Sequence, residues 1–399
     1  MTAVSDSPTA APTASGRRRV LVAIGTRPEA IKLAPVVRAL QDRDRLAVRV
    51  LATAQHRQML DQVLRFFAIE PDLDLDLMQA GQTLSDLTAR LLTAVDGVLA
   101  DEQPDLVVGQ GDTTTVLATA LACFYRGVPF AHVEAGLRTG DLGAPFPEEM
   151  NRAVTGRLAH LHFPPTEGAA QNLRDEGVAD AAIEVTGNPV IDALLWAAEH
   201  GDLSDEFAPP SGERLVLLTA HRRESFGAPL LEICAAVREL VRQRPVRVVY
   251  PVHPNPTVQA TVHRELGDEP KVQLIEPLDY PRFVAAMRAA HLVWTDSGGV
   301  QEEAPALGKP VLVLRDTTER PEGVTAGTAR LVGPSRERIL AETLRLLDDD
   351  AAYRAVASAV NPYGDGHAAP RIAAAVERFL CGASAAAGET AWRGGAASR

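Results

Sequence analysis

Short runs of apolar, often β-branched residues alternate with amphipathic stretches along the first half of the chain. Between the apolar runs, segments such as Glu29–Leu40 and Leu84–Ala100 have apolar residues at three- and four-residue spacing, which is typical of helices with one buried face. This alternation predicts a parallel sheet covered by helices on both faces. The expected strands are Val20–Ile24, Val48–Ala52, Leu106–Gly109, Phe130–Val133, His160–Phe163 and Ile183–Thr186.

A second series of the same kind follows the polar, proline-containing stretch Gly201–Glu213. Its expected strands are Leu215–Thr219, Val246–Pro251, Val272–Ile275, Leu292–Trp294, Val311–Leu314 and Leu331–Val332. The pattern therefore predicts an α/β fold of two tandem Rossmann-like, doubly wound domains facing a central cleft. We expect domains at residues 19–190 and 191–366, a helix at 367–382, and disordered low-complexity ends at 1–18 and 383–399. In such sheets, ligands bind beyond the carboxyl ends of the strands.

Composition narrows the class of protein. Hydrophobic residues make up 46% and charged residues 23% of the 399 residues, as in soluble globular proteins. The formal net charge of -12 argues against a protein that binds nucleic acid or an anionic membrane, because such proteins carry an excess of positive charge. Three scattered cysteines indicate a reducing compartment rather than a disulfide or metal framework, and no apolar run approaches the roughly 18 residues of a membrane span.

Polar residues gather after the expected strands of the first domain. Arg27 and Lys32 lie at the start of a helix, where two cations are best explained by a bound anion; the alternative is a pair of solvated surface charges. Asp112, Glu134 and Glu148 follow strands or a loop at one sheet edge. Carboxylates crowded together have divergent pKa values, which suits acid–base catalysis. The alternative is that Asp112 and Glu148 merely cap helices.

The second domain has a candidate phosphate site after the strand that ends at Trp294. Ser297 is placed to cap the next helix, Gly298 and Gly299 let a ligand approach its unpaired N–H groups, and Glu303 could accept bonds from a ribose diol. An ordinary strand–turn–helix connection is the alternative. His221, which is followed by two arginines, also suggests phosphate contacts. The sequence has no GxxxxGK[ST] and no GxGxxG after its first strand, which disfavours P-loop and dinucleotide redox enzymes.

Together these motifs resemble the bacterial non-hydrolysing UDP-N-acetylglucosamine 2-epimerases over roughly residues 19 to 380. The resemblance rests on nine motifs in order: Gly25-Thr-Arg-Pro-Glu-Ala-Ile-Lys, Thr53-Ala-Gln-His-Arg, Gly111-Asp-Thr-Thr-Thr, His132-Val-Glu-Ala-Gly-Leu-Arg-Thr, Pro147-Glu-Glu, His221-Arg-Arg-Glu-Ser-Phe-Gly, Asp296-Ser-Gly-Gly-Val-Gln-Glu-Glu-Ala-Pro, Arg315-Asp-Thr-Thr-Glu-Arg-Pro-Glu and Asn361-Pro-Tyr-Gly-Asp-Gly. It implies a fold of the GT-B type with the last helix returning to the first domain.

The resemblance also implies an activity and roles for individual residues. The reaction would be reversible C2 epimerisation of UDP-N-acetylglucosamine to UDP-N-acetylmannosamine, by elimination of UDP to a 2-acetamidoglucal and re-addition. No cofactor or metal would be needed, and the enzyme would be a cytoplasmic homodimer that can bind a second UDP-sugar as activator. The implied catalytic residues are Asp112, Glu134, Glu148 and His221; substrate contacts would add Arg27, Lys32, Phe283, Ser297, Gly298, Gly299, Glu303 and Arg320, and the activator site Gln55 and Gln58.

Three other functions stay open on the sequence. A hydrolysing 2-epimerase would release free N-acetylmannosamine and UDP, and nothing in the sequence decides whether water reaches the glycal. A GT-B glycosyltransferase would use a UDP-sugar with an acceptor. A non-catalytic nucleotide-sugar sensor would have kept the UDP site alone, although the intact carboxylates argue against it.

Overall fold

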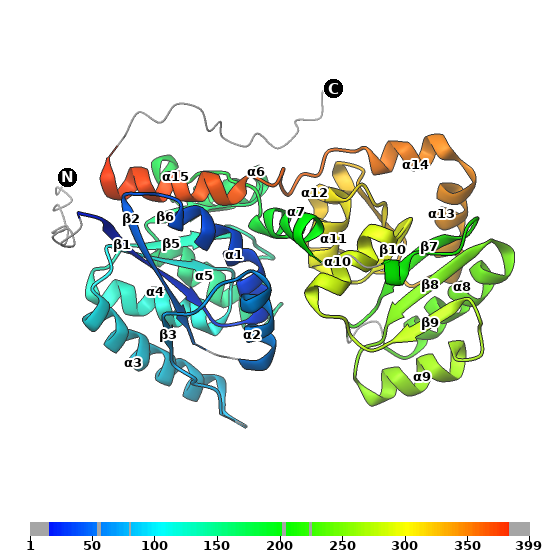
Figure 1. Ribbon diagram of the computed structural model, residues 1–399, viewed down its shortest axis with the longest axis horizontal. Helices are drawn as coiled ribbons and strands as arrows, with labels where there is room; N and C mark the ends of the chain where they lie inside the picture. Colours follow the sequence, from blue (N-terminus) through cyan, green and yellow to red (C-terminus); the bar gives the residue numbers. More distant parts are fainter. Residues whose placement is uncertain (1–15, 54–56, 80, 202–204, 223–225, 383–399) are drawn as a thin grey trace. The chain divides into compact units, whose positions relative to one another are not determined.

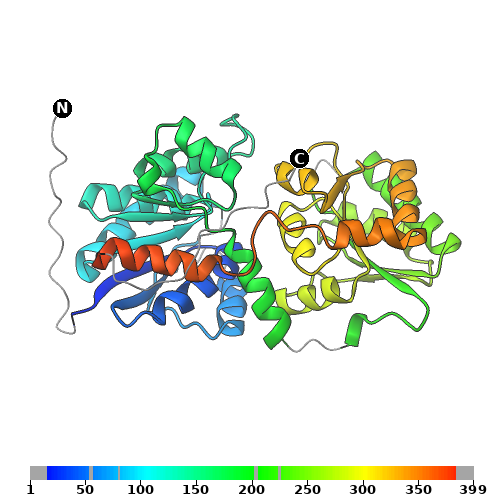
Figure 2. The ribbon, with the colours of Figure 1, turned by 90° about the horizontal axis from the view of Figure 1, so that it is seen from above.

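The structure is a computed structural model that describes residues 16–53, 57–79, 81–201, 205–222 and 226–382. The chain divides into two compact units, each with its own sheet and core. The first unit contains the described residues up to Ala193 together with those from Gly364 onward, and the second unit contains Leu194–Tyr363. In each unit the strands lie between layers of helices (Figures 1 and 2).

The first unit is built on a six-stranded sheet in which every pair of neighbouring strands is parallel. The spatial order β3-β2-β1-β4-β5-β6 reverses direction between β1 and β4, so the turns that follow these two central strands lie at one edge. The strands are β1 (Arg18–Ile24), β2 (Leu46–Ala52), β3 (Leu73–Asp74), β4 (Leu106–Gln110), β5 (Phe130–Val133) and β6 (Leu161–Phe163).

Helices cover both faces of this sheet. Helix α7 (Pro189–His200) begins in this unit and continues into the second, because the division falls between Ala193 and Leu194. The helices that lie wholly in the first unit are α1 (Arg27–Gln41), α2 (Arg57–Phe66), α3 (Leu84–Glu102), α4 (Thr114–Arg126), α5 (Glu148–Leu158), α6 (Glu167–Asp175) and α15 (Ala368–Cys381). The last of them, α15, packs on α1 although more than 300 residues separate the two in sequence. The Asp192 carboxylate fixes its start by accepting bonds from the backbone N–H groups of Ala368 and Ala369, at 3.2 and 2.8 Å.

The prediction of a strand at Ile183–Thr186 in the first unit is wrong. Residues 183–186 form only a single bridge, between Ile183 and His162. Their neighbour β6 ends at Phe163 and is followed by Pro164 and Pro165, which have no N–H group to extend a ladder. The sequence also missed β3, a two-residue edge strand with no distinctive apolar run.

The second unit repeats the architecture with the parallel order β12-β11-β10-β7-β8-β9. Its strands are β7 (Arg214–Thr219), β8 (Val246–Pro251), β9 (Val272–Ile275), β10 (Leu292–Thr295), β11 (Val311–Val313) and β12 (Ala329–Leu331). Its helices are α8 (Ala228–Gln243), α9 (Pro256–Leu266), α10 (Tyr280–Ala289), α11 (Gly298–Ala306), α12 (Pro321–Thr325), α13 (Arg336–Asp348) and α14 (Asp350–Ala357). The expected α/β class of two doubly wound Rossmann-like units is confirmed.

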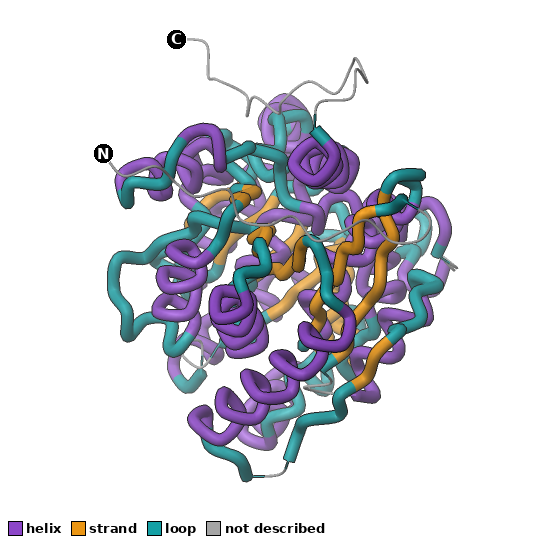
Figure 3. Tube along the Cα trace, turned by 90° about the vertical axis from the view of Figure 1, so that its left-hand side faces the viewer, coloured by secondary structure: helices purple, strands orange, loops and turns teal. Residues whose placement is uncertain are grey.

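The cores explain why these strands are central. Every residue from Val20 to Ile24 is buried, and Trp294 and Tyr250 are the largest fully buried side chains of the second unit. The Tyr250 hydroxyl donates to the Ala220 carbonyl at 3.1 Å, so its polar atom is satisfied inside the core. Viewed as a tube, the strands lie among the surrounding helices (Figure 3). Among the described residues no helix combines the length and apolar character that crossing a membrane requires.

Candidate functional site

The carboxyl edge of the first sheet brings together the turns that follow β1, β4 and β5. At the β1 turn, Thr26 caps α1 through a capping box with Glu29, whose Oε2 accepts from the N–H groups of Gly25 and Thr26 at 2.5 and 3.2 Å. The Thr113 hydroxyl of the β4 turn donates to the other oxygen, Oε1, at 2.6 Å. Glu29, to which the sequence assigned no role, therefore ties two of these turns together.

Glu134, directly after β5, is buried and adopts a left-handed backbone conformation with φ 61°. Such a conformation is unfavourable for a residue with a Cβ and is characteristic of functional sites. Its Oε1 lies 2.5 Å from Lys32 Nζ and accepts a bond from Asn188 Nδ2 at 2.9 Å, and Gln110 Nε2 donates to its Oε2. One cation and two amides therefore fix this carboxylate in place and favour its negative charge.

Asp112 has different surroundings. Its side chain is 30% exposed and forms a 2.9 Å ion pair with Arg152. Burial raises the pKa of Asp112 to about 6; Arg152 opposes this rise, and the negative charges of Glu134 and Glu148 add to it. A carboxyl group with this pKa exchanges protons near neutral pH, as an acid–base catalyst must.

Glu148 completes the expected group of carboxylates from the first turn of α5, where it lies close enough to raise the pKa of Asp112. The structure therefore brings all three predicted carboxylates together. The alternative role for Asp112 is wrong, because Thr113 is the N-cap of α4 and its hydroxyl accepts from Val116 N at 3.4 Å. Glu148 does lie in the first turn of α5, as its own alternative required, but the N-cap residue there is Pro147 and no side-chain capping bond is formed.

The two cations near the start of α1 differ in their surroundings. Arg27 is exposed at the first position of the helix, whereas Lys32, one turn later, contacts Glu134. We expected an external anion for both residues. In this structure the anion beside Lys32 is a carboxylate of the protein itself.

In the second unit, Asp296 organises the turn that carries His221. Asp296 is fully buried, and its Oδ2 accepts bonds from the N–H groups of His221 and Arg222, each at 2.8 Å. Its Oδ1 lies 3.0 Å from His221 Nδ1. The His221 side chain is 44% exposed, and because Nδ1 faces Asp296, Nε2 is the ring nitrogen that is presented to a ligand.

The turn at Ser297–Gly299 starts α11, as the sequence predicts, but Ser297 does not cap that helix with its side chain. The hydroxyl that accepts a bond here belongs to Thr295, which takes the Ser297 N–H at 2.9 Å. A Cβ added to Gly298 would lie 3.9 Å from both Arg222 NH2 and Arg320 Cζ. Two guanidinium groups therefore approach the N-terminus of α11, an arrangement suited to a phosphate.

The Glu319 carboxylate already pairs with one of these guanidinium groups, that of Arg222, and also with the guanidinium of Arg315. Glu319 Oε2 lies 3.0 Å from Arg315 NH1, and Oε1 lies 3.5 Å from Arg222 NH1. Glu319 Oε2 would also be 3.8 Å from a Cβ on Gly298. The protein therefore carries its own negative charge at the candidate phosphate site.

Glu303 faces the same turn from inside α11. Its Oε1 accepts a bond from the Tyr280 hydroxyl at 3.1 Å, and its Oε2 would lie 3.7 Å from a Cβ on Gly299. Burial, with Glu303 adding to the effect, raises the pKa of Tyr280 well above its ordinary value, so the hydroxyl stays a donor. Phe283, on the same helix as Tyr280, is half-buried. Arg320 is oriented by Glu302, to which its Nε donates.

Several residues of the site were not found from the sequence. Gln110 and Arg152 adjoin quoted motifs and could have been found by proximity, whereas nothing local connects Asn188 with Glu134, 54 residues away. Of the two expected activator residues, Gln55 lies outside the described residues, and Gln58 lies in α2 without a described side chain.

Comparison with known proteins agrees with this arrangement. The family described as UDP-N-acetylglucosamine 2-epimerase matches residues 38–377. The UDP-N-acetylglucosamine 2-epimerase of Escherichia coli K12 is 53% identical over 370 residues, which cover 90% of this chain and 98% of that protein.

Solved structures give the same result. The Neisseria meningitidis UDP-GlcNAc 2-epimerase bound to UDP-GlcNAc has a TM-score of 0.83 at 44% identity, covering 91% of this chain and 99% of its own. A putative UDP-N-acetylglucosamine 2-epimerase from Listeria monocytogenes has a TM-score of 0.85 at 48% identity, covering 91% and 97%. The predicted family is confirmed, and the chain belongs to the UDP-N-acetylglucosamine 2-epimerases.

Proposed function

We propose that this protein is a non-hydrolysing UDP-N-acetylglucosamine 2-epimerase, an isomerase that interconverts UDP-N-acetylglucosamine and UDP-N-acetylmannosamine. The observation that carries the proposal is the gathering of Asp112, Glu134 and Glu148 beside Lys32 and Arg152 in a member of this family. A nucleotide-sugar sensor would not require a carboxyl group with a pKa of about 6 beside two other carboxylates.

The chemistry explains why several carboxylates are needed. The hydrogen on C2 is not acidic in the ground state, because no carbonyl group adjoins C2. As the bond from C1 to the diphosphate oxygen breaks, its electron pair leaves with UDP and C1 gains oxocarbenium character. A base then takes the C2 proton, and the C2–H electron pair forms the C1=C2 bond of the glycal. Protonation of C2 from the opposite face and return of UDP to C1 complete the reaction, so groups on two faces must carry protons.

The carboxylates divide this work according to their surroundings. Asp112 is partly exposed and titrates near neutral pH, so it carries a proton, with Glu148 as the second proton carrier. Glu134 is held by Lys32, Gln110 and Asn188, so it supplies a fixed negative charge for the oxocarbenium-like transition state.

The leaving group is held by fixed dipoles and cations. The N-terminus of α11 at Ser297, Gly298 and Gly299 receives the diphosphate, together with Arg320 and His221. Glu303 accepts bonds from the ribose hydroxyls, and Phe283 lies against the uracil. The family resemblance adds Arg27 and Lys32 as substrate contacts, Lys32 while it is paired with Glu134.

Three further features are proposed from the family resemblance. The enzyme works as a cytoplasmic homodimer. A second UDP-sugar molecule activates it through a region that includes Gln55 and Gln58. The reaction needs no added cofactor.

Product analysis tests the proposal against its rivals. Incubation with UDP-N-acetylglucosamine, followed by phosphorus and proton NMR, should show a stable mixture of the two UDP-sugars. Stoichiometric UDP with free N-acetylmannosamine would identify a hydrolysing epimerase instead. Transfer of the sugar to an added acceptor without epimerisation would identify a glycosyltransferase.

A further inference from the structure

Glu149 is a buried carboxylate that the proposed reaction does not use. Only 1% of its side chain is exposed. Its Oε1 accepts bonds from the backbone N–H groups of Thr139 and Gly140, at 2.8 and 3.0 Å. Glu149 therefore holds the start of the glycine- and proline-rich loop, residues 139–147, against helix α5.

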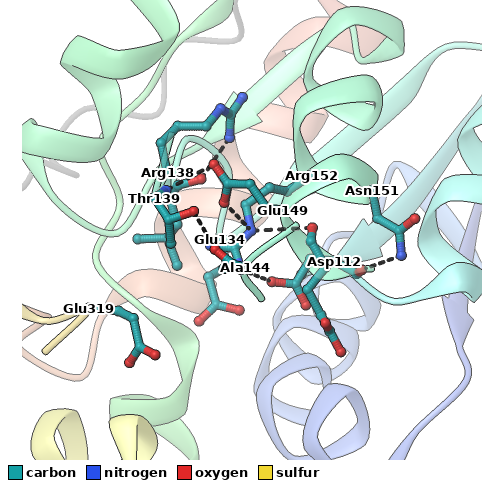
Figure 4. Close-up of polar contacts among 12 residues, drawn as sticks. Asp112, Glu134, Arg138, Thr139, Ala144, Glu149, Asn151, Arg152 and Glu319 are labelled. Atoms are coloured by element: carbon teal, nitrogen blue, oxygen red, sulfur yellow. Dashed lines mark hydrogen bonds and ion pairs between the residues drawn. The ribbon is translucent and has the colours of Figure 1, made fainter. Parts of the chain in front are cut away.

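The same carboxylate faces the cation that pairs with Asp112. Its Oε2 lies 3.4 Å from Arg152 Nε, while Arg152 NH2 lies 2.9 Å from Asp112 Oδ2. Figure 4 shows the guanidinium of Arg152 between the two carboxylates. Arg152 is itself buried, so both of its ion pairs lie where solvent screens them weakly.

The loop held by Glu149 is a compact turn. The Thr139 hydroxyl donates to the Ala144 carbonyl at 2.6 Å, and the Gly143 N–H donates to Asp141 Oδ1 at 2.9 Å. The loop exposes Phe146, whose surface is 69% accessible, and runs directly into α5 with Glu148, Glu149 and Arg152. Glu149 therefore binds the loop and contacts Arg152, the partner of Asp112, and it lies next to Glu148, the predicted proton carrier.

We propose that Glu149 is a positioning residue that ties the 139–147 loop to Asp112 through Arg152. This inference rests on the proposed function, because it requires Asp112 to carry a proton in the reaction. Arg152 Nε donates to the Glu148 carbonyl at 3.4 Å, and Glu149 Oε2 lies on the same side of the guanidinium as the ion-pair partner that keeps the NH2 group toward Asp112. When the loop detaches from Glu149, Arg152 loses this support and the acid loses its orientation.

The charges that surround Asp112 give the direction of the effect on pH dependence. Arg152 and Glu148 face it from α5, Lys32 from α1, and Glu134 from the end of β5. Glu149→Gln removes a negative charge that offsets Arg152, so the pKa of Asp112 should fall. The limb of the profile of kcat against pH that reports Asp112 should then move to lower pH. Removing the charge of Arg152 should move that limb to higher pH.

The experiment compares full-length wild type, Glu149→Gln and Arg152→Lys. The control is Glu167→Gln. Glu167 lies in the first turn of α6 and forms an exposed ion pair with Arg174. The readouts are kcat and KM against pH, the affinity for UDP, and hydrogen–deuterium exchange of peptides covering 139–147. Glu149→Gln should lower kcat by about 10- to 100-fold, because misplacing a reacting group by about 1 Å has effects of this size. Its UDP affinity should be unchanged and exchange in the loop faster.

Arg152→Lys separates positioning from folding. It keeps the positive charge but cannot bridge two carboxylates, so kcat should fall while loop exchange stays as in wild type, since Glu149 still holds Thr139 and Gly140. If Glu149→Gln fails to fold, Arg152→Lys still tests the inference, because a lower kcat with wild-type loop exchange is expected of that variant alone.

Wild-type kcat in either folded variant, or an unmoved pH profile in folded Glu149→Gln, would overturn the inference. If wild type itself does not epimerise UDP-N-acetylglucosamine, the proposed function fails instead, which the same assay of wild type shows directly. Unchanged activity in Glu167→Gln is required in either case.

Discussion

Replacing Glu29 with Gln should change the pH dependence of stability. Glu29 is buried, and burial raises its pKa from the ordinary 4.5 to about 7, against the opposing hydrogen bonds from Thr113, Gly25 and Thr26. Because the pKa is higher in the folded state, the folded protein retains a proton that the unfolded chain releases between about pH 4.5 and 7. Stability therefore falls through this interval on account of Glu29, and the penalty is fully present above pH 7.

The size of the effect follows from the pKa values. A difference of about 2.5 between 4.5 and 7, at about 1.36 kcal/mol for each pH unit, gives a penalty of about 3 kcal/mol as an upper limit. Glutamine can keep the three hydrogen bonds by turning its oxygen toward Gly25 and Thr26 and its amide toward the Thr113 hydroxyl. Glu29→Gln should therefore be stabilising at pH 8 and close to neutral at pH 5.

Urea unfolding of wild type and variant at pH 5 and pH 8 measures this difference. The comparison of two proteins at each pH cancels the other titrating groups, including Asp112 and Asp192, whose pKa values burial also raises. A variant that is equally destabilised at both pH values would refute the reasoning. It would show that the hydrogen bonds to ionised Glu29 outweigh its burial.

Three further substitutions probe the site. Asp112→Asn should retain UDP binding but lower the epimerisation rate by about 10²- to 10⁴-fold, as expected for an acid–base group, and equal loss of binding would make it a binding residue. Asn188→Ala removes one amide donor from Glu134, so kcat should fall by about tenfold with UDP affinity unchanged; an unaltered kcat would contradict the role given to Glu134. Glu319→Gln removes the protein's own negative charge beside Arg315 and Arg222, so calorimetry should show UDP binding about 3- to 10-fold tighter, and weaker binding would show that Glu319 instead orients those cations.

Much of the fold was predictable because buried parallel strands leave a strong pattern. The apolar runs of β1, β4 and β5 are buried throughout their lengths, so periodicity alone finds them. Weak signals failed where the backbone rather than the side chains decided the outcome. The strand expected at 183–186 does not form because the two prolines after β6 cannot extend a hydrogen-bonded ladder to it. The edge strand β3 has only two residues and therefore almost no pattern of its own.

The candidate site shows the same division. Asp112, Glu134 and Glu148 were predictable because each follows a strand or loop at one sheet edge, and the structure brings them together. Their differences were not predictable. The contact of Asn188 with Glu134 joins distant segments, and the two-sided pairing of Arg152 depends on the register of α5 against the β4 turn. Ser297 is the N-cap residue of α11, as predicted, but its hydroxyl forms no capping hydrogen bond, and the hydroxyl that accepts a bond at this turn is that of Thr295.

The central claim is that carboxylates of the first unit move the C2 proton of a UDP-sugar while UDP leaves and returns. The most direct measurement is incubation with UDP-N-acetylglucosamine in deuterated water, followed by mass spectrometry of both UDP-sugars. The account predicts UDP-N-acetylmannosamine carrying one deuterium at C2, and gradual labelling of the remaining UDP-N-acetylglucosamine at the same position. Formation of UDP-N-acetylmannosamine with its original C2 hydrogen would contradict the account, because it would show that no proton is exchanged at that carbon.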